Sequence, residues 1–277
     1  MLTVGSLFSG IGGLDLGLER AGHKVIWQSE IDSYASRVLK KHWPDVPNIG
    51  DVTKIDWGKI PYVELIAGGY PCQPFSTAGK RRGTDDPRHL WPYVRNAISG
   101  IRPRYVLLEN VPGHVTLGLS TVLGEISALG YCAEWQIISA AAFGAPHLRE
   151  RLFIVAYPDD ARGGTPEREL VFGENTVSTW WQRQTRPLNG IGGRGKVLAH
   201  ADGGRCKERE PETESFSGFG SASERNAKWW QIEPNVGRVA NGVPNRVDRL
   251  KGLGNAVVPQ VAEFMGYLIN QHAKQFQ

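Results

Sequence analysis

The sequence lacks the features that mark secreted, membrane-spanning and cysteine-rich proteins. Its three cysteines, Cys72, Cys132 and Cys206, are far apart and form no C-x-x-C pair. An odd and dispersed set argues against a disulfide framework and against a cysteine zinc site. No apolar run approaches the roughly 20 residues that cross a bilayer, and no basic segment precedes the apolar residues of the N-terminus. We therefore expect a reduced, cytoplasmic protein that is neither secreted nor inserted into a membrane.

The sequence also lacks a large excess of one charge. Its 277 residues include 32 basic and 28 acidic side chains, which gives a formal net charge of +4. Residues 72–110 hold seven Lys and Arg against three Asp and Glu, which leaves 25 of each sign elsewhere. The whole positive excess therefore lies in one stretch of the chain.

Short apolar segments alternate with helix-like patterns up to about residue 157. Strands are predicted at residues 3–8, 24–30, 63–69, 104–110, 134–140 and 151–157, with a very short one at 48–50. Helices are predicted at residues 14–21, 31–43, 90–101 and 120–129. This alternation is typical of a parallel, doubly wound α/β sheet. We assign residues 1–157 to one Rossmann-like domain.

The rest of the chain divides into two parts. Residues 158–244 are rich in Gly, Arg, Glu and Asn, lose the apolar periodicity and contain two Trp-Trp pairs, so we expect a separate, irregular module there. Residues 245–277 begin with a glycine-flanked turn and continue as an amphipathic helix. We expect this last segment to pack back on the first domain.

A glycine-rich turn follows the first predicted strand at residues 9–13, within FSGIGG at 8–13. Glycines let the backbone approach a ligand, and the next helix begins with free N–H groups. Glu30 and Asp51 follow two further strands, and Glu30 suits ribose hydroxyls at the ligand edge of such a sheet. The spacing is not G-x-G-x-x-G, so hydride transfer with NAD loses support. The sequence favours an adenosine-bearing cofactor, and a merely tight connection is the alternative.

Cys72 follows the strand at 63–69 and lies between two prolines, in a loop where parallel sheets place active sites. Prolines stiffen the turn, and the basic residues at 80–82 would favour a thiolate if they lie near it. A nucleophile and a structural cysteine are about equally consistent with this pattern. Cys132 lies in a more ordinary apolar setting, and Cys206 lies in the irregular module without a visible activating partner.

Three more charged residues lie where the sheet should meet a ligand. Glu109 ends the strand at 104–110, and a helix cap or a salt bridge is the alternative to a catalytic role. Arg149 and Arg151 alternate with Glu150 and point to one side if the segment is extended. Two arginines there suit phosphate or carbonyl oxygens, and solvated surface charge is the alternative.

Taken together, these motifs resemble those of the cytosine-5 DNA methyltransferases, in the family's order and over nearly the whole chain. Residues 8–13 resemble the first cofactor motif, residues 71–73 (PCQ) the nucleophile loop and residues 109–111 (ENV) the glutamate motif. Residues 254–257 (GNAV) resemble the last motif, and the irregular module falls where the family has its target recognition domain. Residues 147–151 match the Gln-x-Arg-x-Arg segment, except that His147 replaces the glutamine.

The resemblance implies methyl transfer from S-adenosylmethionine, with S-adenosylhomocysteine as product, to carbon 5 of a cytosine flipped out of double-stranded DNA. The implied catalytic residues are Cys72 as nucleophile, Glu109 at the ring nitrogen, and Arg151 with Arg149 at the base carbonyl and backbone. The implied cofactor residues are Phe8, Ser9, Gly10, Gly12, Gly13, Leu14, Glu30, Ile31, Asp51, Val52, Pro71, Asn255 and Val257. The implied DNA contacts are Gln73, Ser76, Lys80, Arg81, Arg82 and Arg88.

The resemblance also sets expectations about partners. We expect no metal, a monomer, association with the nucleoid through DNA, and a cognate restriction endonuclease as a candidate partner. A tRNA cytosine-5 methyltransferase is one alternative, because that branch of the family shares the Pro-Cys-Gln loop. A DNA-binding relative without turnover is the other alternative, and the intact Cys72, Glu109 and Arg151 set argues against it.

Overall fold

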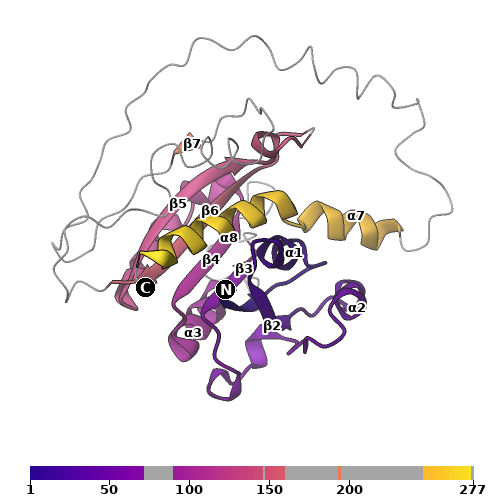
Figure 1. The fold of residues 1–277 in the computed structure, drawn as a ribbon, viewed down its shortest axis with the longest axis horizontal. Helices are drawn as coiled ribbons and strands as arrows, with labels where there is room; N and C mark the ends of the chain where they lie inside the picture. The colour runs from indigo at the N-terminus through magenta and orange to yellow at the C-terminus, as the bar shows by residue number, and fades with distance from the viewer. Residues whose placement is uncertain (72–89, 146, 160–192, 195–245, 276–277) are drawn as a thin grey trace, which may run out of the picture.

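A computed structural model describes residues 1–71, 90–145, 147–159, 193–194 and 246–275 of the chain (Figure 1). The other residues include Cys72 and most of the module predicted at 158–244. Across the described ranges, every helix is too short or too polar to span a bilayer.

Four parallel strands form one half of a mixed sheet: β1 (Thr3–Leu7), β2 (Lys24–Ser29), β3 (Leu65–Gly69) and β4 (Tyr105–Asn110). They lie in the order β2-β1-β3-β4. Each was predicted within two residues, because buried strands are short runs of β-branched and apolar side chains that turn residues interrupt. The segment predicted as a strand at 48–50 forms only an isolated bridge between Gln28 and Asn48.

The other half of the sheet is antiparallel. Strand β6 (Glu150–Pro158) lies between β4 and β5 (Tyr131–Ser139) and runs opposite to both, and the two-residue β7 (Gly193–Arg194) pairs with β5. The expectation of a wholly parallel sheet is therefore wrong at this side. The β5–β6 connection spans residues 140–149 and includes the 3-10 turn η6 (Ala140–Phe143), whereas a parallel return needs a crossover of a dozen or more residues.

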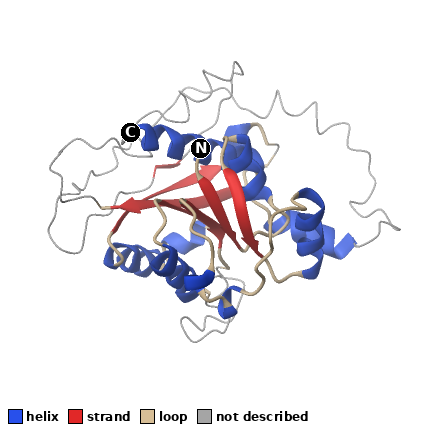
Figure 2. Cartoon of the chain, turned by 60° about the horizontal axis from the view of Figure 1, so that its bottom comes forward, coloured by secondary structure: helices blue, strands red, loops and turns tan. Residues whose placement is uncertain are grey.

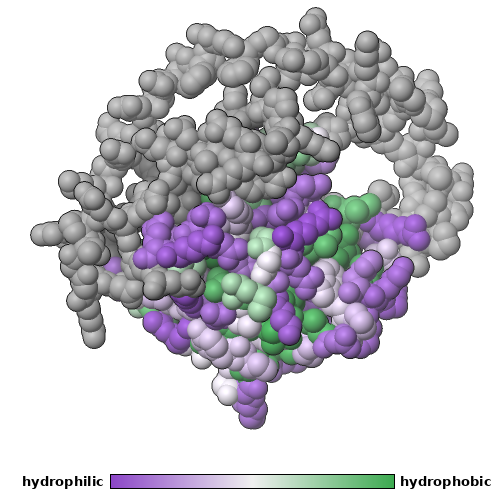
Figure 3. Space-filling view, in the orientation of Figure 1, coloured by the Kyte–Doolittle hydropathy of each residue, from purple (hydrophilic) through white to green (hydrophobic). Residues whose placement is uncertain are grey.

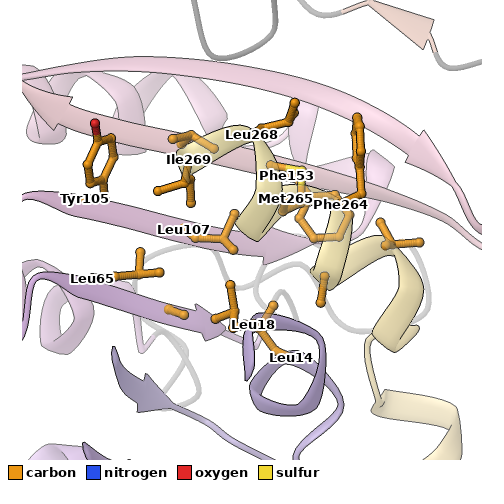
Figure 4. Close-up of a cluster of buried hydrophobic side chains, with 14 of the residues drawn as sticks. Leu14, Leu18, Leu65, Tyr105, Leu107, Phe153, Phe264, Met265, Leu268 and Ile269 are labelled. Carbon is orange, nitrogen blue, oxygen red and sulfur yellow. The ribbon is translucent and has the colours of Figure 1, made fainter. Parts of the chain in front are cut away.

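Helices cover both faces of the sheet (Figure 2). On one face, α1 (Gly13–Arg20) packs against α8 (Pro259–Lys274), and their apolar side chains share a buried cluster with those of the strands (Figure 4). On the other face, α3 (Trp91–Ile101) and α4 (Leu119–Ala128) bury a second cluster. This two-sided burial confirms the doubly wound arrangement.

The C-terminal segment returns to the first domain as predicted. The expected helix is α8, and its apolar side chains are buried against α1 and the sheet, among them Val261, Phe264, Leu268 and Ile269. The α1–α8 approach is close, since a Cβ at Gly17 would lie 2.3 Å from the Cβ of Ala262. The turn expected before this helix is instead a further helix, α7 (Arg246–Asn255). Helical glycine costs only about 1 kcal/mol relative to alanine, so the two glycines inside α7 do not exclude a helix.

Three more short elements connect the sheet: α2 (Ser33–His42) and the 3-10 turns η1 (Val52–Lys54) and η2 (Trp57–Lys59). A fourth, η5 (Pro112–Val115), directly follows β4. On the face seen in Figure 3, polar and apolar residues of the described part are interspersed. The hydropathy of this face therefore does not mark a ligand site, whereas the strand ends do indicate one edge of the sheet.

Candidate active site

The carboxyl ends of β1 to β4 meet at one edge of the sheet. In the strand register, Leu7 pairs with Ser29 on one side and Gly68 on the other, and Gly69 pairs with Glu109. The residues that follow these strands therefore lie on neighbouring strand ends, which is where ligands bind in open α/β sheets.

The glycine-rich turn after β1 wraps around the carboxylate of Glu30. Gly10 and Gly12 have positive φ angles of 56° and 84°, which glycine adopts without a steric penalty, and Phe8 before them has a φ of 52°, which is uncommon for a residue with a side chain. The Gly10 N–H donates a 2.8 Å hydrogen bond to Oε2 of Glu30, and the Asp32 N–H donates one of 2.7 Å to Oε1. Each carboxylate oxygen keeps a second lone pair for a ribose hydroxyl. The geometry therefore fits the cofactor role implied for Glu30.

A buried carboxylate that the sequence analysis missed lies behind this turn. Asp15 of α1 is fully buried and accepts hydrogen bonds from Ser6 Oγ at 3.1 Å and Gln28 Nε2 at 3.0 Å. Ser9 of the turn donates to Ser6 Oγ at 2.9 Å. Burial raises the pKa of Asp15 to about 6. One feature of the sequence could have indicated this buried carboxylate. Asp15 directly follows Leu14 in a helix whose apolar side chains had to face the core.

The next predicted cofactor residues have different surroundings. Asp51 accepts hydrogen bonds from the hydroxyl of Thr53 and then from its backbone N–H at the start of η1, and these bonds lower the pKa of Asp51. Val52 is buried in the core, whereas the Ile31 side chain is 73% exposed just after Glu30. Ile31 therefore offers an accessible apolar surface beside the turn. The cofactor-binding roles implied for Asp51 and Val52 stay predictions.

Glu109 and Arg151 form the best-defined polar pair of the site. Arg151 Nε lies 2.8 Å from Glu109 Oε1, and Glu109 is only 9% exposed. Burial raises the pKa of Glu109 to about 7, against the opposing effects of Arg151 and then Arg149. Gly69 gives the carboxylate room, because a Cβ there would lie 2.7 Å from Glu109 Oε2. This carboxyl group can therefore hold or release a proton near neutral pH.

Cys72 and the six predicted DNA contacts lie outside the described residues, but the chain leading to Cys72 is well anchored. Tyr70 is 4% exposed, and its hydroxyl lies 2.7 Å from Nε2 of buried His114. His114 Nδ1 lies 2.9 Å from the Leu117 carbonyl, which requires the proton on Nδ1 and makes the Tyr70 hydroxyl the donor. Asn110 donates to the Tyr70 carbonyl at 3.2 Å. These contacts tie Tyr70, which directly follows β3, to the segment that carries Glu109, and the sequence analysis did not identify them.

The last motif contacts the first, but Arg149 does not join Arg151 at Glu109 through any hydrogen bond. Its Nη2 donates instead to the carbonyls of Gly254 and Ala256, both at 2.7 Å. Asn255 is exposed between them, and Val257 is buried against α1. Position 147, where histidine replaces the family glutamine, is exposed. The structure therefore places Val257, near the C-terminus, against Gly13 and Leu14, near the N-terminus, and all three are predicted cofactor residues.

We expect Gly13→Ala to weaken S-adenosylmethionine binding and to lower stability, because a Cβ there would lie 2.4 Å from the Val257 carbonyl oxygen. Since backbone on both sides must shift, the loss should be about 1–3 kcal/mol. The matched control is Gly124→Ala in α4, where a Cβ meets nothing within 4 Å. It should raise stability by about 0.5–1 kcal/mol through helix propensity. Thermal unfolding and calorimetric titration of the cofactor test both, and equal behaviour of the two variants would refute the close contact.

Comparisons with known proteins identify the family of the chain. The Rossmann-like fold is similar to that of EhMeth, a methyltransferase of Entamoeba histolytica, with a TM-score of 0.59 at 17% identity and 98% of each chain covered. The family model of C-5 cytosine-specific DNA methylases matches residues 2–182. The chain belongs to that family.

Two relatives also resemble this chain. The Type II methyltransferase M.DsaV of Dactylococcopsis salina is 39% identical over 158 residues, which cover 55% of this chain and 45% of that protein. The Type II methyltransferase M.Eco47II of Escherichia coli is 41% identical over 172 residues, which cover 58% and 41%. The matched part of the chain thus spans less than half the length of these two relatives.

Proposed function

We propose that this protein transfers a methyl group from S-adenosylmethionine to carbon 5 of a cytosine in a specific duplex DNA sequence. The observation that carries the proposal is the buried Glu109–Arg151 pair, which adjoins the strand end leading into Cys72. A carboxyl group with a pKa of about 7 and a fixed guanidinium match the ring nitrogen and carbonyl of cytosine.

The cofactor would be held by the glycine turn and by both chain ends. Glu30 would accept hydrogen bonds from the ribose hydroxyls, Ile31 would cover an apolar face of the adenine, and the α1 N-terminus would face the charged amino-acid end. Asn255 and Val257 would close the site from the C-terminal side. When bound, S-adenosylmethionine supplies an electrophilic methyl group.

The residues of the chain would activate the cytosine ring. The Cys72 thiolate would form a bond from Sγ to carbon 6, and the ring nitrogen would take the proton of Glu109 while Arg151 holds the ring carbonyl. Carbon 5 then carries the electron density needed to accept a methyl group. After transfer, a base removes the proton from carbon 5, the electron pair re-forms the ring double bond, and the Cys72 thiolate leaves. Glu109 recovers its proton from the ring nitrogen.

Access to the ring requires that the base turn out of the duplex, at a cost of a few kcal/mol. Lys80, Arg81, Arg82 and Arg88, which follow Cys72, would contact phosphates around the flipped nucleotide. We propose that residues 1–157 and 245–277 form the catalytic part and that 158–244 form the target recognition domain. Residues 159–250 hold 14 basic and 13 acidic side chains, so individual arginines rather than net charge would read the base edges.

The experiment that tests this function compares substrates with methyl-labelled cofactor. Duplex DNA should become labelled and tRNA should not, and DNA containing 5-fluorocytosine should form a covalent complex in the presence of the cofactor. Labelling of tRNA alone would indicate a tRNA cytosine-5 methyltransferase instead. A DNA complex without labelling or covalent capture would indicate a binding protein without turnover.

Replacement of Arg81 and Arg82 by glutamine should weaken DNA binding at every sequence and lower its salt dependence. Each lost phosphate contact should reduce the slope of log K against log salt by about one unit. Binding titrations at several salt concentrations measure this slope. An unchanged slope would show that these two side chains are only solvated.

The remaining proposals concern the cellular setting. We propose a cytoplasmic monomer that needs no metal, associates with the nucleoid through DNA and works beside a cognate restriction endonuclease. Bisulfite sequencing of host DNA with and without the gene would identify the target site, and light scattering would give the oligomeric state.

A further inference from the structure

Arg149 occupies a constrained place at the entrance of β6. Its φ is +36°, a region that non-glycine residues rarely adopt. The carbonyl just before it, that of Leu148, accepts hydrogen bonds from Ser139 Oγ at 2.7 Å and from the Ala140 N–H at 2.8 Å. The backbone of the β5–β6 connection is thus held from the β5 side. This anchoring aims the Arg149 side chain at the C-terminal end of α7.

The two carbonyls that Arg149 reaches belong to a helix end. Gly254 lies in the last turn of α7 and Ala256 lies just beyond it. The last carbonyls of a helix lack intrahelical partners and carry the negative end of its dipole. One guanidinium nitrogen at 2.7 Å from both carbonyls satisfies them with charge-assisted bonds. Arg149 therefore fixes the backbone on both sides of Asn255.

The same helix end is held against the cofactor turn by other contacts. The Val257 carbonyl lies against the backbone of Gly13, where a Cβ would come within 2.4 Å. Lys251 of α7 pairs with Asp32, two residues beyond Glu30, at 2.7 Å. The position of the α7 end thus affects residues 13 and 32, which flank the proposed cofactor site on two sides.

We propose that Arg149 is a positioning residue of the cofactor site, which acts by clamping the backbone around Asn255, and that it does not contact the flipped base. Arg151 alone, paired with Glu109, faces the reacting ring. This inference rests on the proposed function, because it names S-adenosylmethionine as the ligand. It departs from the base and backbone contact that the sequence resemblance implied for Arg149.

The test measures cofactor binding without DNA and without turnover. Arg149→Gln should weaken the affinity for S-adenosylmethionine about tenfold in calorimetric titrations, as expected for the loss of one charged hydrogen-bond donor. Arg149→Lys, which keeps a charged donor, should recover the affinity to within about threefold of the wild type. The matched control is Arg151→Gln on the same strand, which should leave the cofactor affinity within about twofold of the wild type.

A second measurement separates positioning from general damage. If Arg149 acts through Asn255, Arg149→Gln should weaken cofactor binding much less in an Asn255→Ala background than in the wild type, since coupled residues are not additive. Thermal unfolding of all variants shows how far stability changes with affinity. Independent, additive losses would overturn the inference.

Other outcomes are equally decisive. If Arg149→Gln kept its cofactor affinity but bound DNA more weakly or turned over more slowly, Arg149 would contact the base or the DNA backbone instead. Equal losses of cofactor affinity in Arg149→Gln and Arg151→Gln would overturn the specific clamp. If the wild-type protein bound no S-adenosylmethionine, the proposed function would fail together with this inference. Tight binding of S-adenosylmethionine by the wild type, Arg149→Lys and Arg151→Gln, with weaker binding by Arg149→Gln, would support the positioning role of Arg149 and agree with the proposed function.

Discussion

Cys72→Ala should lower the rate of DNA methylation by on the order of 10⁴-fold or more, because the reaction has no other route to activate carbon 5. The affinity for S-adenosylmethionine should stay nearly unchanged, since Cys72 attacks the base and the cofactor turn lies on another strand end. The measurement is methyl transfer to duplex DNA, together with calorimetric titration of the cofactor. Covalent capture by 5-fluorocytosine DNA should disappear in the same variant.

The matched control is Cys132→Ala. Cys132 lies in β5, half-buried beside the core and far along the sequence from the nucleophile loop. Its replacement should cost at most about 1 kcal/mol of stability and leave methylation in place. Retained activity in Cys72→Ala would make the central assignment wrong, whatever the control does.

The Glu109–Arg151 pair predicts a pH dependence with a definite sign. If Glu109 gives its proton to the ring, kcat/KM for DNA should fall as the pH rises through about 7, the value to which burial raises the pKa of Glu109. Arg151 lowers that pKa, so Arg151→Gln should move the falling limb to higher pH. Glu109→Gln should lower the rate by about 10²–10⁴-fold and abolish the limb. A limb that stays in place in Arg151→Gln would assign it to another group.

Stability gives an independent measure of the same pKa. Glu109 binds its proton more tightly in the folded state, so the wild-type protein should lose stability as the pH rises from about 4.5 to about 7. Glu109→Gln has no such carboxyl group. Its stability relative to the wild type should therefore rise over this window by up to about 3 kcal/mol. Denaturant unfolding at pH 5 and pH 8 measures the difference, and a constant difference would show that the pKa is not raised.

Local patterns were enough to predict the part of the fold that carries the site. The strands ending near Leu7, Ser29 and Asn110 are short buried segments that are followed by turns. Each can be recognised from the apolar pattern of its own few residues. The glycine turn, Glu30 and Glu109 follow these strands, so their meeting at one edge follows from the parallel order alone. Their confirmed position at that edge depends on no contact between distant side chains.

Other features depend on contacts between residues far apart in the chain. The partners of Arg149 lie more than 100 residues away, and Tyr70 lies 44 residues from its partner His114. The antiparallel direction of β6 and the helix α7 were also missed. A charged residue near a strand end looks the same in the sequence whether its side chain faces a ligand or a helix terminus. Only the position of the C-terminal end of α7 beside Arg149 distinguishes the two.

The order of the motifs, the strand ends that carry them and the stretch that holds the net positive charge can all be read from the amino-acid sequence alone. The tertiary structure decided what surrounds each charged group. Glu109 acquires a pKa near neutrality because neighbouring strands remove water from it while Arg151 lies at 2.8 Å. Two arginines that are two residues apart serve different partners because one meets a buried carboxylate and the other meets two helix-end carbonyls. The sequence gives the charge of each side chain and its spacing along the chain. The burial of a charged group and its distance from a partner arise only when the chain folds.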